Sequence, residues 1–173
     1  MPLIKDRCVV EDRWLHVADD EALPADGGII VSLARWEADQ DLLRGRNSAL
    51  GIRLKSDERP AAIAADLDRF ELVALEFPAF KDGRAYSAAR LLRERYGFTG
   101  ELRAVGDVLR DQLQFMLRCG FDAFEYAGGA AAGEAVAAFD EIGAVYQTAA
   151  DRRRSAAVER NDRSATFLNG TCG

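Results

Sequence analysis

The chain has 173 residues, of which 49% are hydrophobic and 30% charged, a composition typical of one folded globular domain and not of a disordered chain. Its 29 acidic side chains outnumber 23 basic ones, and the net charge of -6 argues against nucleic acid as a main partner. No apolar run approaches the roughly 18 residues of a membrane span, and no secretory signal is recognisable, so we expect a cytoplasmic protein without a membrane partner.

The first 28 residues differ in pattern from those that follow. Residues 1–28 combine Trp14 and His16 with an acidic run at 19–21, and they do not read as a strand followed by a helix. We expect an N-terminal hairpin or arm laid against the domain. On this interpretation His16, the one histidine of the chain, is incidental to function.

From residue 29 onward, strand and helix patterns alternate. Apolar and β-branched runs predict strands at 29–33, 50–54, 72–77, 102–105 and 122–126. Helical patterns occupy 36–44, 61–69, 87–96, 108–119 and 134–146, and Gly97 and Gly120 stand where left-handed helix caps are expected. The alternation predicts an α/β domain of about five βα units over residues 29–146.

Connections of this length favour a mostly parallel sheet covered by helices. Because an eight-unit barrel needs about 200 residues or more, we expect either an open doubly wound sheet or a partial barrel. After Tyr146 the chain is rich in charge and poor in large apolar side chains. Residues 147–173 are therefore expected to form a mobile C-terminal tail.

The cysteines and glycines indicate no cofactor or metal site. Cys8, Cys119 and Cys172 are odd in number and widely spaced, which argues against a disulfide framework and a zinc cage. Cys119 continues the apolar stripe of its helix, so we expect a buried thiol. The GGAAAG stretch at 128–133 matches neither a dinucleotide-binding fingerprint nor a phosphate-binding loop. We expect no bound cofactor and no metal.

The polar residues that follow the predicted strands mark the candidate site. In parallel sheets, ligands bind in the crevice beyond the carboxyl ends of the strands. Charged side chains of both signs occur at or near these ends: Glu76, Lys81, Asp82, Arg84, Arg103, Asp107 and Glu125.

Three hypotheses account for this charged rim. In the first it is structural: Asp107 caps the next helix, Asp82 forms a turn, and Glu76 pairs with Arg84 or Arg103. In the second, Arg84 and Arg103 hold a small oxyanion or phosphate together with the amide groups that open the following helices.

In the third hypothesis Glu76, Asp107 and Glu125 bind a divalent cation through their oxygens, as in magnesium-dependent barrel enzymes. The sequence offers no nucleophile elbow and no serine or cysteine triad, which disfavours acyl-transfer hydrolysis.

The segment from 75 to 125, LEFPAFKDGRAYSAARLLRERYGFTGELRAVGDVLRDQLQFMLRCGFDAFE, resembles the bacterial domain-of-unknown-function family 934. Upstream, IIVSLARW and LGIRL are also similar to that family's pattern, so the resemblance covers roughly residues 28–146. Members are commonly encoded beside the assimilatory sulfite reductase haemoprotein and carry the label of oxidoreductases in sulfite reduction. The resemblance therefore implies a place in sulfate assimilation, and it supplies no catalytic residues.

The resemblance and the residues together favour an accessory protein of assimilatory sulfite reduction. We expect it to bind the sulfite reductase or a small anionic sulfur compound through Asp82, Arg84, Arg103 and Asp107. Because the chain lacks a dinucleotide fingerprint and an iron–sulfur cysteine set, any electrons would pass through its partner. The alternative is a small metal- or phosphate-dependent α/β enzyme with carboxylates at the strand ends. A further idea is that Cys172 carries sulfur.

Overall fold

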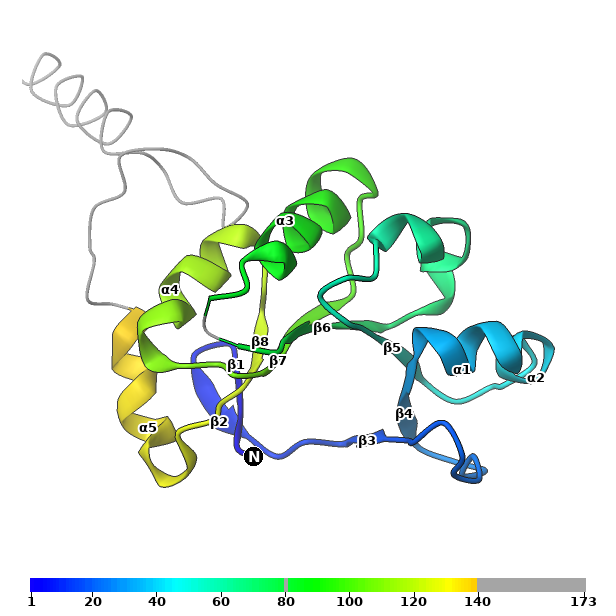
Figure 1. Cartoon of the computed structure of the whole chain (residues 1–173). Helices are drawn as coiled ribbons and strands as arrows, with labels where there is room; N and C mark the ends of the chain where they lie inside the picture. Colours follow the sequence, from blue (N-terminus) through cyan, green and yellow to red (C-terminus); the bar gives the residue numbers. More distant parts are fainter. Residues whose placement is uncertain (80, 140–173) are drawn as a thin grey trace, which may run out of the picture.

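The computed structural model describes residues 1–79 and 81–139, which form one curled sheet with helices packed against it (Figure 1). The strand order is β2-β1-β8-β7-β6-β5-β4-β3. The pairs from β3 to β8 are parallel, and β1 is antiparallel to both of its neighbours. The sheet forms a half-barrel, because a contact between His16 and Glu125 joins β3 to β8 across its concave side.

The strands are β1 Leu3–Lys5, β2 Cys8–Val10, β3 Trp14–His16, β4 Gly28–Ser32, β5 Leu50–Leu54, β6 Leu72–Phe77, β7 Glu101–Gly106 and β8 Ala123–Glu125. The helices are α1 Leu33–Ala38, α2 Gln40–Arg44, η1 Pro60–Arg69, α3 Arg84–Arg90, η2 Leu91–Arg95, α4 Arg110–Cys119, η3 Gly129–Ala131, α5 Ala132–Ala135 and η4 Val136–Phe139. Strands β4 to β8 are the five that the sequence predicts, and a mixed α/β fold with a mostly parallel sheet is confirmed.

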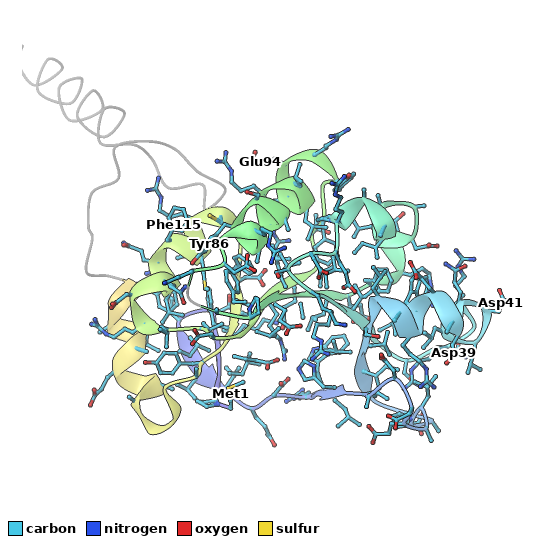
Figure 2. The ribbon with its side chains drawn as sticks, viewed as in Figure 1. Met1, Asp39, Asp41, Tyr86, Glu94 and Phe115 are labelled. Atoms are coloured by element: carbon cyan, nitrogen blue, oxygen red, sulfur yellow. The ribbon has the colours of Figure 1, made fainter. Side chains whose placement is uncertain are left out.

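The convex face of the half-barrel carries the main apolar core. Along β4 to β8 alternate side chains point to this face, as the two-residue period of a strand requires. They pack against α1 to α4 in one continuous cluster that includes Trp36, Phe77, Leu113 and Phe121, all nearly inaccessible to solvent. In Figure 2 Tyr86 of α3 lies beside Phe115 of α4, with ring centroids 4.9 Å apart. Helices thus cover one face, so the partial-barrel alternative describes the sheet and the doubly wound alternative is wrong.

The concave face has only a small apolar cluster. Ile30, Leu72, Ala74 and Val105 are buried there, and the ring of Trp14 packs against them from β3. The close approach of this ring requires glycine at position 28, because a Cβ atom there would lie 2.9 Å from Cε3 of Trp14. Trp14, which comes from the N-terminal residues 1–28, thus fills the interior of the half-barrel.

Residues 1–28, expected to be a hairpin or arm, supply three strands of the sheet. Strands β1 and β2 form a hairpin beside β8, whereas β3 pairs with β4 at the opposite edge. The intervening chain therefore passes beneath the concave face from one side of the sheet to the other (Figure 1). This path brings the N-terminal segment next to the charged side chains of β7 and β8.

The helices differ from the prediction mainly at their ends and in their type. The predicted helix 36–44 is divided at Asp39 into α1 and α2, η1 is a 3₁₀ helix, and α3 continues into the π-helical turn η2. Gly97 and Gly120 have φ angles of 67° and 106°, which confirms both left-handed caps. The predicted helix 134–146 is described only up to Phe139, and the tail 147–173 and Cys172 lie outside the described residues.

Candidate functional site

Five polar side chains stand at or next to the carboxyl ends of parallel strands, at positions that strand alternation turns to the concave face. They come from β3, β4, β5, β6 and β8, and we call them the strand-end ring: His16, Ser32, Arg53, Glu76 and Glu125. Their placement follows from strand alternation, since the neighbouring residues Val31, Ile52, Leu54, Leu75 and Phe124 all belong to the convex core. The ring occupies the position at which parallel α/β sheets bind ligands.

His16 and Glu125 close the ring. Nε2 of His16 lies 2.8 Å from Oε1 of Glu125, although the two residues are 109 positions apart in the chain. The His16 side chain is 36% exposed and that of Glu125 only 12%, so the imidazole faces solvent while the carboxylate is largely enclosed. Burial would raise the pKa of Glu125, but the hydrogen bonds from His16 and Arg103 outweigh it, and the pKa lies below its usual value.

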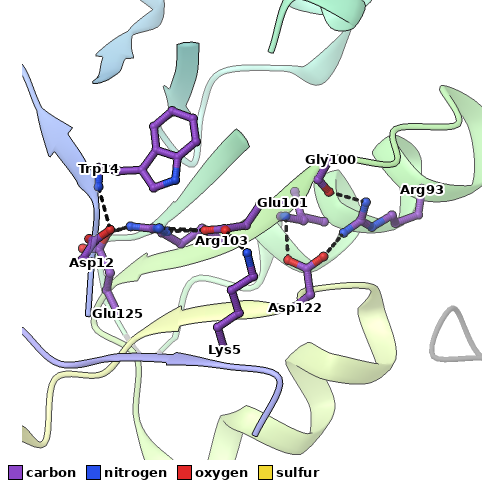
Figure 3. Close-up of polar contacts among 10 residues, drawn as sticks. Lys5, Asp12, Trp14, Arg93, Gly100, Glu101, Arg103, Asp122 and Glu125 are labelled. Carbon is purple, nitrogen blue, oxygen red and sulfur yellow. Dashed lines mark hydrogen bonds and ion pairs between the residues drawn. The ribbon is translucent and has the colours of Figure 1, made fainter. Parts of the chain in front are cut away.

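Arg103 holds Glu125 from inside the half-barrel. Its side chain is fully buried, and Nη1 donates to Oδ2 of Asp12 at 2.8 Å and to Oε1 of Glu125 at 3.2 Å. Its Nε donates to Oε1 of Glu101 at 2.8 Å, and Lys5 binds the other oxygen of Glu101 at 2.7 Å (Figure 3). Burial alone would lower the pKa of the guanidinium, yet Asp12 and Glu101 raise it, so this cation is fixed in place.

A second ion pair fixes the strands beside this network. Arg93 donates from Nη2 to Asp122 at 2.8 Å and from Nη1 to the carbonyl oxygen of Gly100 at 2.8 Å (Figure 3). The other carboxylate oxygen of Asp122 accepts the backbone N–H of Leu102 at 2.8 Å. Burial raises the pKa of Asp122 in spite of these partners. This pair lies at the amino ends of β7 and β8, so it supports the sheet and not the ring.

Arg53 and Glu76 form the looser half of the ring. Nε of Arg53 lies 3.9 Å from Oε2 of Glu76, beyond hydrogen-bond distance. Among the described residues Oε2 of Glu76 has no hydrogen-bond partner although it is buried. The Arg53 side chain is 40% exposed. The hypothesis that Glu76 pairs with Arg84 or Arg103 is therefore wrong, because its cationic neighbour comes from β5.

Asp82 and Arg84 form an exposed pair after β6. Nε and Nη2 of Arg84 donate to the two oxygens of Asp82 at 3.0 and 2.6 Å, and Nη2 also donates to Oγ of Ser56 at 2.8 Å. These hydrogen bonds hold the pKa of Asp82 well below its usual range. The Arg84 side chain remains 61% exposed. The guanidinium is thus anchored between the loops that follow β5 and β6 while it faces solvent.

The four predicted binding residues do not form one cluster. Asp82 and Arg84 are bonded to each other, whereas Arg103 is buried on the concave face among Asp12, Glu101 and Glu125. Unlike Arg84, the Arg103 side chain is 0% exposed, so none of it faces the solvent from which a ligand would arrive. The reason is strand alternation, which turns residue 103 away from the rim and into the half-barrel.

Asp107 is not the N-cap residue of the following helix, because that position is Leu109. Its backbone N–H donates to the carbonyl oxygen of Phe77, and α4 begins only at Arg110, where the side chain of Gln112 accepts the N–H of Leu109 at 3.0 Å. Within residues 1–79 and 81–139, no group of three His, Cys, Asp or Glu side chains is arranged to hold a metal ion. The proposed set of Glu76, Asp107 and Glu125 therefore does not assemble.

Three ring residues were not among the predicted site residues: His16, Ser32 and Arg53. A usable signal was the alternation in Trp14–His16, where the two residues that flank Leu15 share one face of a short strand. Gly28 was a second signal, because a glycine that opens a buried parallel strand often marks the close approach of a large side chain. The buried thiol of Cys119 was predicted correctly, and burial raises its pKa.

A family model described as "Bacterial protein of unknown function (DUF934)" matches residues 51–157, more than half of the chain. The chain belongs to this family. The DUF934 match includes Arg53, Glu76 and Glu125 of the ring and the Asp82–Arg84 pair, while His16 and Ser32 precede it. The family resemblance is confirmed, and the link with sulfite reduction stays a prediction.

No curated protein and no solved structure matches the chain. In the part of the chain that the structure describes, no helix combines the length and apolar character that crossing a membrane requires.

Proposed function

We propose that this DUF934 protein is an accessory protein of assimilatory sulfite reduction, which binds the sulfite reductase or an anionic sulfur compound at the Asp82–Arg84 pair. Support comes from the family, whose members the sequence resemblance associates with that pathway, and from the chemistry of the pair. Sulfite and sulfate are oxyanions, and the guanidinium group of arginine donates charge-assisted hydrogen bonds to such groups.

The observation that carries the proposal is the anchored, exposed guanidinium of Arg84. Asp82 and Ser56 fix Nε and Nη2, so little side-chain freedom is lost when an anion or a partner carboxylate binds. The 61% exposure of the side chain leaves it accessible from solvent. Lys81 lies in the same loop and adds positive charge beyond the carboxyl end of β6.

The same surface suits a protein partner. A fixed arginine at the centre of a contact is a frequent source of binding energy, and a charged rim guides the encounter between partners. In this proposal the reductase carries the redox chemistry, and the DUF934 protein positions the reductase or its anionic ligand.

Growth of a deletion strain tests the pathway. The strain is grown with sulfate, sulfite, sulfide or cysteine as sole sulfur source and is complemented with the wild-type gene. We expect failure on sulfate and sulfite, and growth on sulfide and cysteine. Normal growth on all four sources would contradict the proposal.

Complementation with variants tests the site. We expect Arg84→Ala to fail on sulfite while Arg90→Ala succeeds, because Arg90 is an exposed helix residue that pairs only with Glu94 among the hydrogen bonds described. Equal growth with both variants would remove the Asp82–Arg84 pair from the function. Protein levels measured in the same cultures separate loss of function from loss of the protein.

A further inference from the structure

The strand-end ring has the geometry of a proton-transfer site. We propose that His16 exchanges a proton with a small organic acid, that Glu125 orients the imidazole, and that Arg53 holds the carboxylate of the acid. The ring lies on the concave face and is distinct from the Asp82–Arg84 pair. The inference therefore does not rest on the proposed function.

The hydrogen bond to Glu125 determines which nitrogen of His16 can act as the base. An ionised carboxylate only accepts hydrogen bonds, so Nε2 of His16, 2.8 Å from Oε1, carries the proton. Nδ1 of the neutral ring then keeps its lone pair. Glu125 thereby fixes the orientation and the tautomer of the imidazole, as the buried carboxylate does in hydrolase triads.

Glu125 is held in place by a residue that cannot move easily. Arg103 is fully buried and binds Glu125, Glu101 and Asp12 at once. A ligand cannot displace these contacts without leaving a buried guanidinium unpaired, which is costly. Glu125 is therefore a positioning residue, and the imidazole it orients is accessible because the His16 side chain is 36% exposed.

Arg53 supplies the anion-binding group of the ring. Strand β5, which carries Arg53, is separated from β3 by β4. The strand pairing places His16 beside Ile30 and Ile30 beside Gly51. Arg53 follows Gly51 by two residues on the same strand face. Ordinary strand spacings place the two Cα atoms about 12 Å apart on the concave face. An arginine side chain and a small acid can bridge this span. Glu76 holds Arg53 only at 3.9 Å, which leaves the guanidinium free to reorient.

The proposed step needs no additional reactant. A C–H or O–H bond of the bound acid breaks, its electron pair stays on the ligand, and the proton forms an N–H bond at Nδ1 of His16. The reverse step returns the proton. Arg53 stabilises the ligand's negative charge throughout, so the site is suited to enolisation or to acid–base exchange beside a carboxylate.

Alkylation of His16 tests the site without knowledge of the ligand. The probe is iodoacetate, a small carboxylate, and the neutral iodoacetamide is the comparison. In either reaction the bond from Nδ1 to the methylene carbon forms, the carbon–iodine bond breaks, and iodide leaves. The full chain carries Cys8→Ser, because Cys8 is an exposed thiol that would consume reagent. Peptide mapping by mass spectrometry follows modification at His16.

We expect iodoacetate to modify His16 about tenfold faster than iodoacetamide, after both rates are divided by those of free imidazole, because Arg53 attracts the anionic reagent. Arg53→Ala should abolish this preference, while Arg90→Ala, an exposed helix residue, should keep it. The product should be the Nδ1-carboxymethyl isomer. Absence of the preference, or its persistence in Arg53→Ala, would overturn the proposal.

Nitrogen NMR of the single histidine tests the orienting role of Glu125. With ¹⁵N-labelled histidine, the wild-type chain should show the Nε2–H tautomer near neutral pH, because Glu125 accepts from Nε2. Glu125→Gln can either accept or donate, so the two tautomers should become mixed and alkylation should occur at both nitrogens. An unchanged tautomer in a folded Glu125→Gln variant would show that Glu125 only supports the fold.

Discussion

The two faces of the half-barrel are built on different principles. The convex face is a continuous apolar core in which each strand packs against helices near it in the sequence. The concave face joins distant segments through charge: Asp12 and His16 of the first segment reach Arg103 and Glu125. Apolar packing tolerates gradual change, whereas a buried charge network fails when one member is lost. The concave face is therefore the specialised face of the molecule.

The largest effect should come from Arg103→Ala. The change leaves Asp12, Glu101 and Glu125 without their shared cation inside the half-barrel. Loss of one partner from a buried ion pair costs about 3–5 kcal/mol. Urea denaturation should show a fall of this size in the free energy of unfolding. If Arg103→Ala lowered the free energy of unfolding no more than the surface variant Arg90→Ala, the charge network would not be what stabilises the concave face.

Gly28→Ala should have an intermediate effect. The new Cβ atom would lie 2.9 Å from Cε3 of Trp14, so the indole must move away from the concave cluster. Overpacking of this kind costs about 1–3 kcal/mol. Trp14 fluorescence, measured in a Trp36→Phe background, should shift with the loss of stability. Gly133→Ala is the control, because its Cβ atom meets nothing within 4 Å; it should leave the fluorescence unchanged and should not lower stability, since alanine favours the helix in which it lies.

Acid should weaken the concave face through Glu125. The pKa of Glu125 in the folded chain lies below the usual value of 4.5. A lowered pKa means that its contribution to stability is fully present above the unfolded pKa and is lost as the pH falls through the folded pKa. Below about pH 4.5 the free energy of unfolding should fall less steeply in Glu125→Gln than in the wild-type chain. The difference between the two falls should be about 1 kcal/mol at most. Denaturation of both proteins from pH 6 to pH 3 measures this, and parallel curves would contradict it.

The smallest effect on stability is expected for Arg84→Ala. The Asp82–Arg84 pair is exposed, so its loss should leave the unfolding curve of the chain unchanged. Binding should change instead: sulfite or sulfate should raise the melting temperature of the wild-type chain and not that of the variant. An equal rise in both proteins would place anion binding elsewhere.

The sequence predicts the convex face well, because its information is local. The five core strands and the Gly97 and Gly120 caps follow from short-range patterns. The concave face depends on pairing across the whole chain, which no local pattern encodes. Residues 101 and 103 did carry a usable signal: charges at alternate positions of a buried parallel strand indicate that one face of the sheet is not covered by helices.

For the candidate site, the sequence predicts where the rim lies but not which residues share it. Asp82 and Arg84 follow β6 as expected, because a loop after a strand must lie beyond its end. Arg103 does not lie at the rim, because strand alternation turns its side chain into the half-barrel. The alternation in β3 indicates the face on which His16 lies, but it does not reveal the partner Glu125, which is 109 positions away.

The pairing of β1 with β8 has a consequence for synthesis of the chain. During translation His16 is added to the nascent chain 109 residues before its partner Glu125. At about 5–20 residues per second, the N-terminal segment waits roughly 5 to 22 s before β8 exists. During that interval Leu3 and Ile4 of β1, which are buried in the folded chain, have no β8 to pair with. The first residues to be made are thus among the last to reach their native partners.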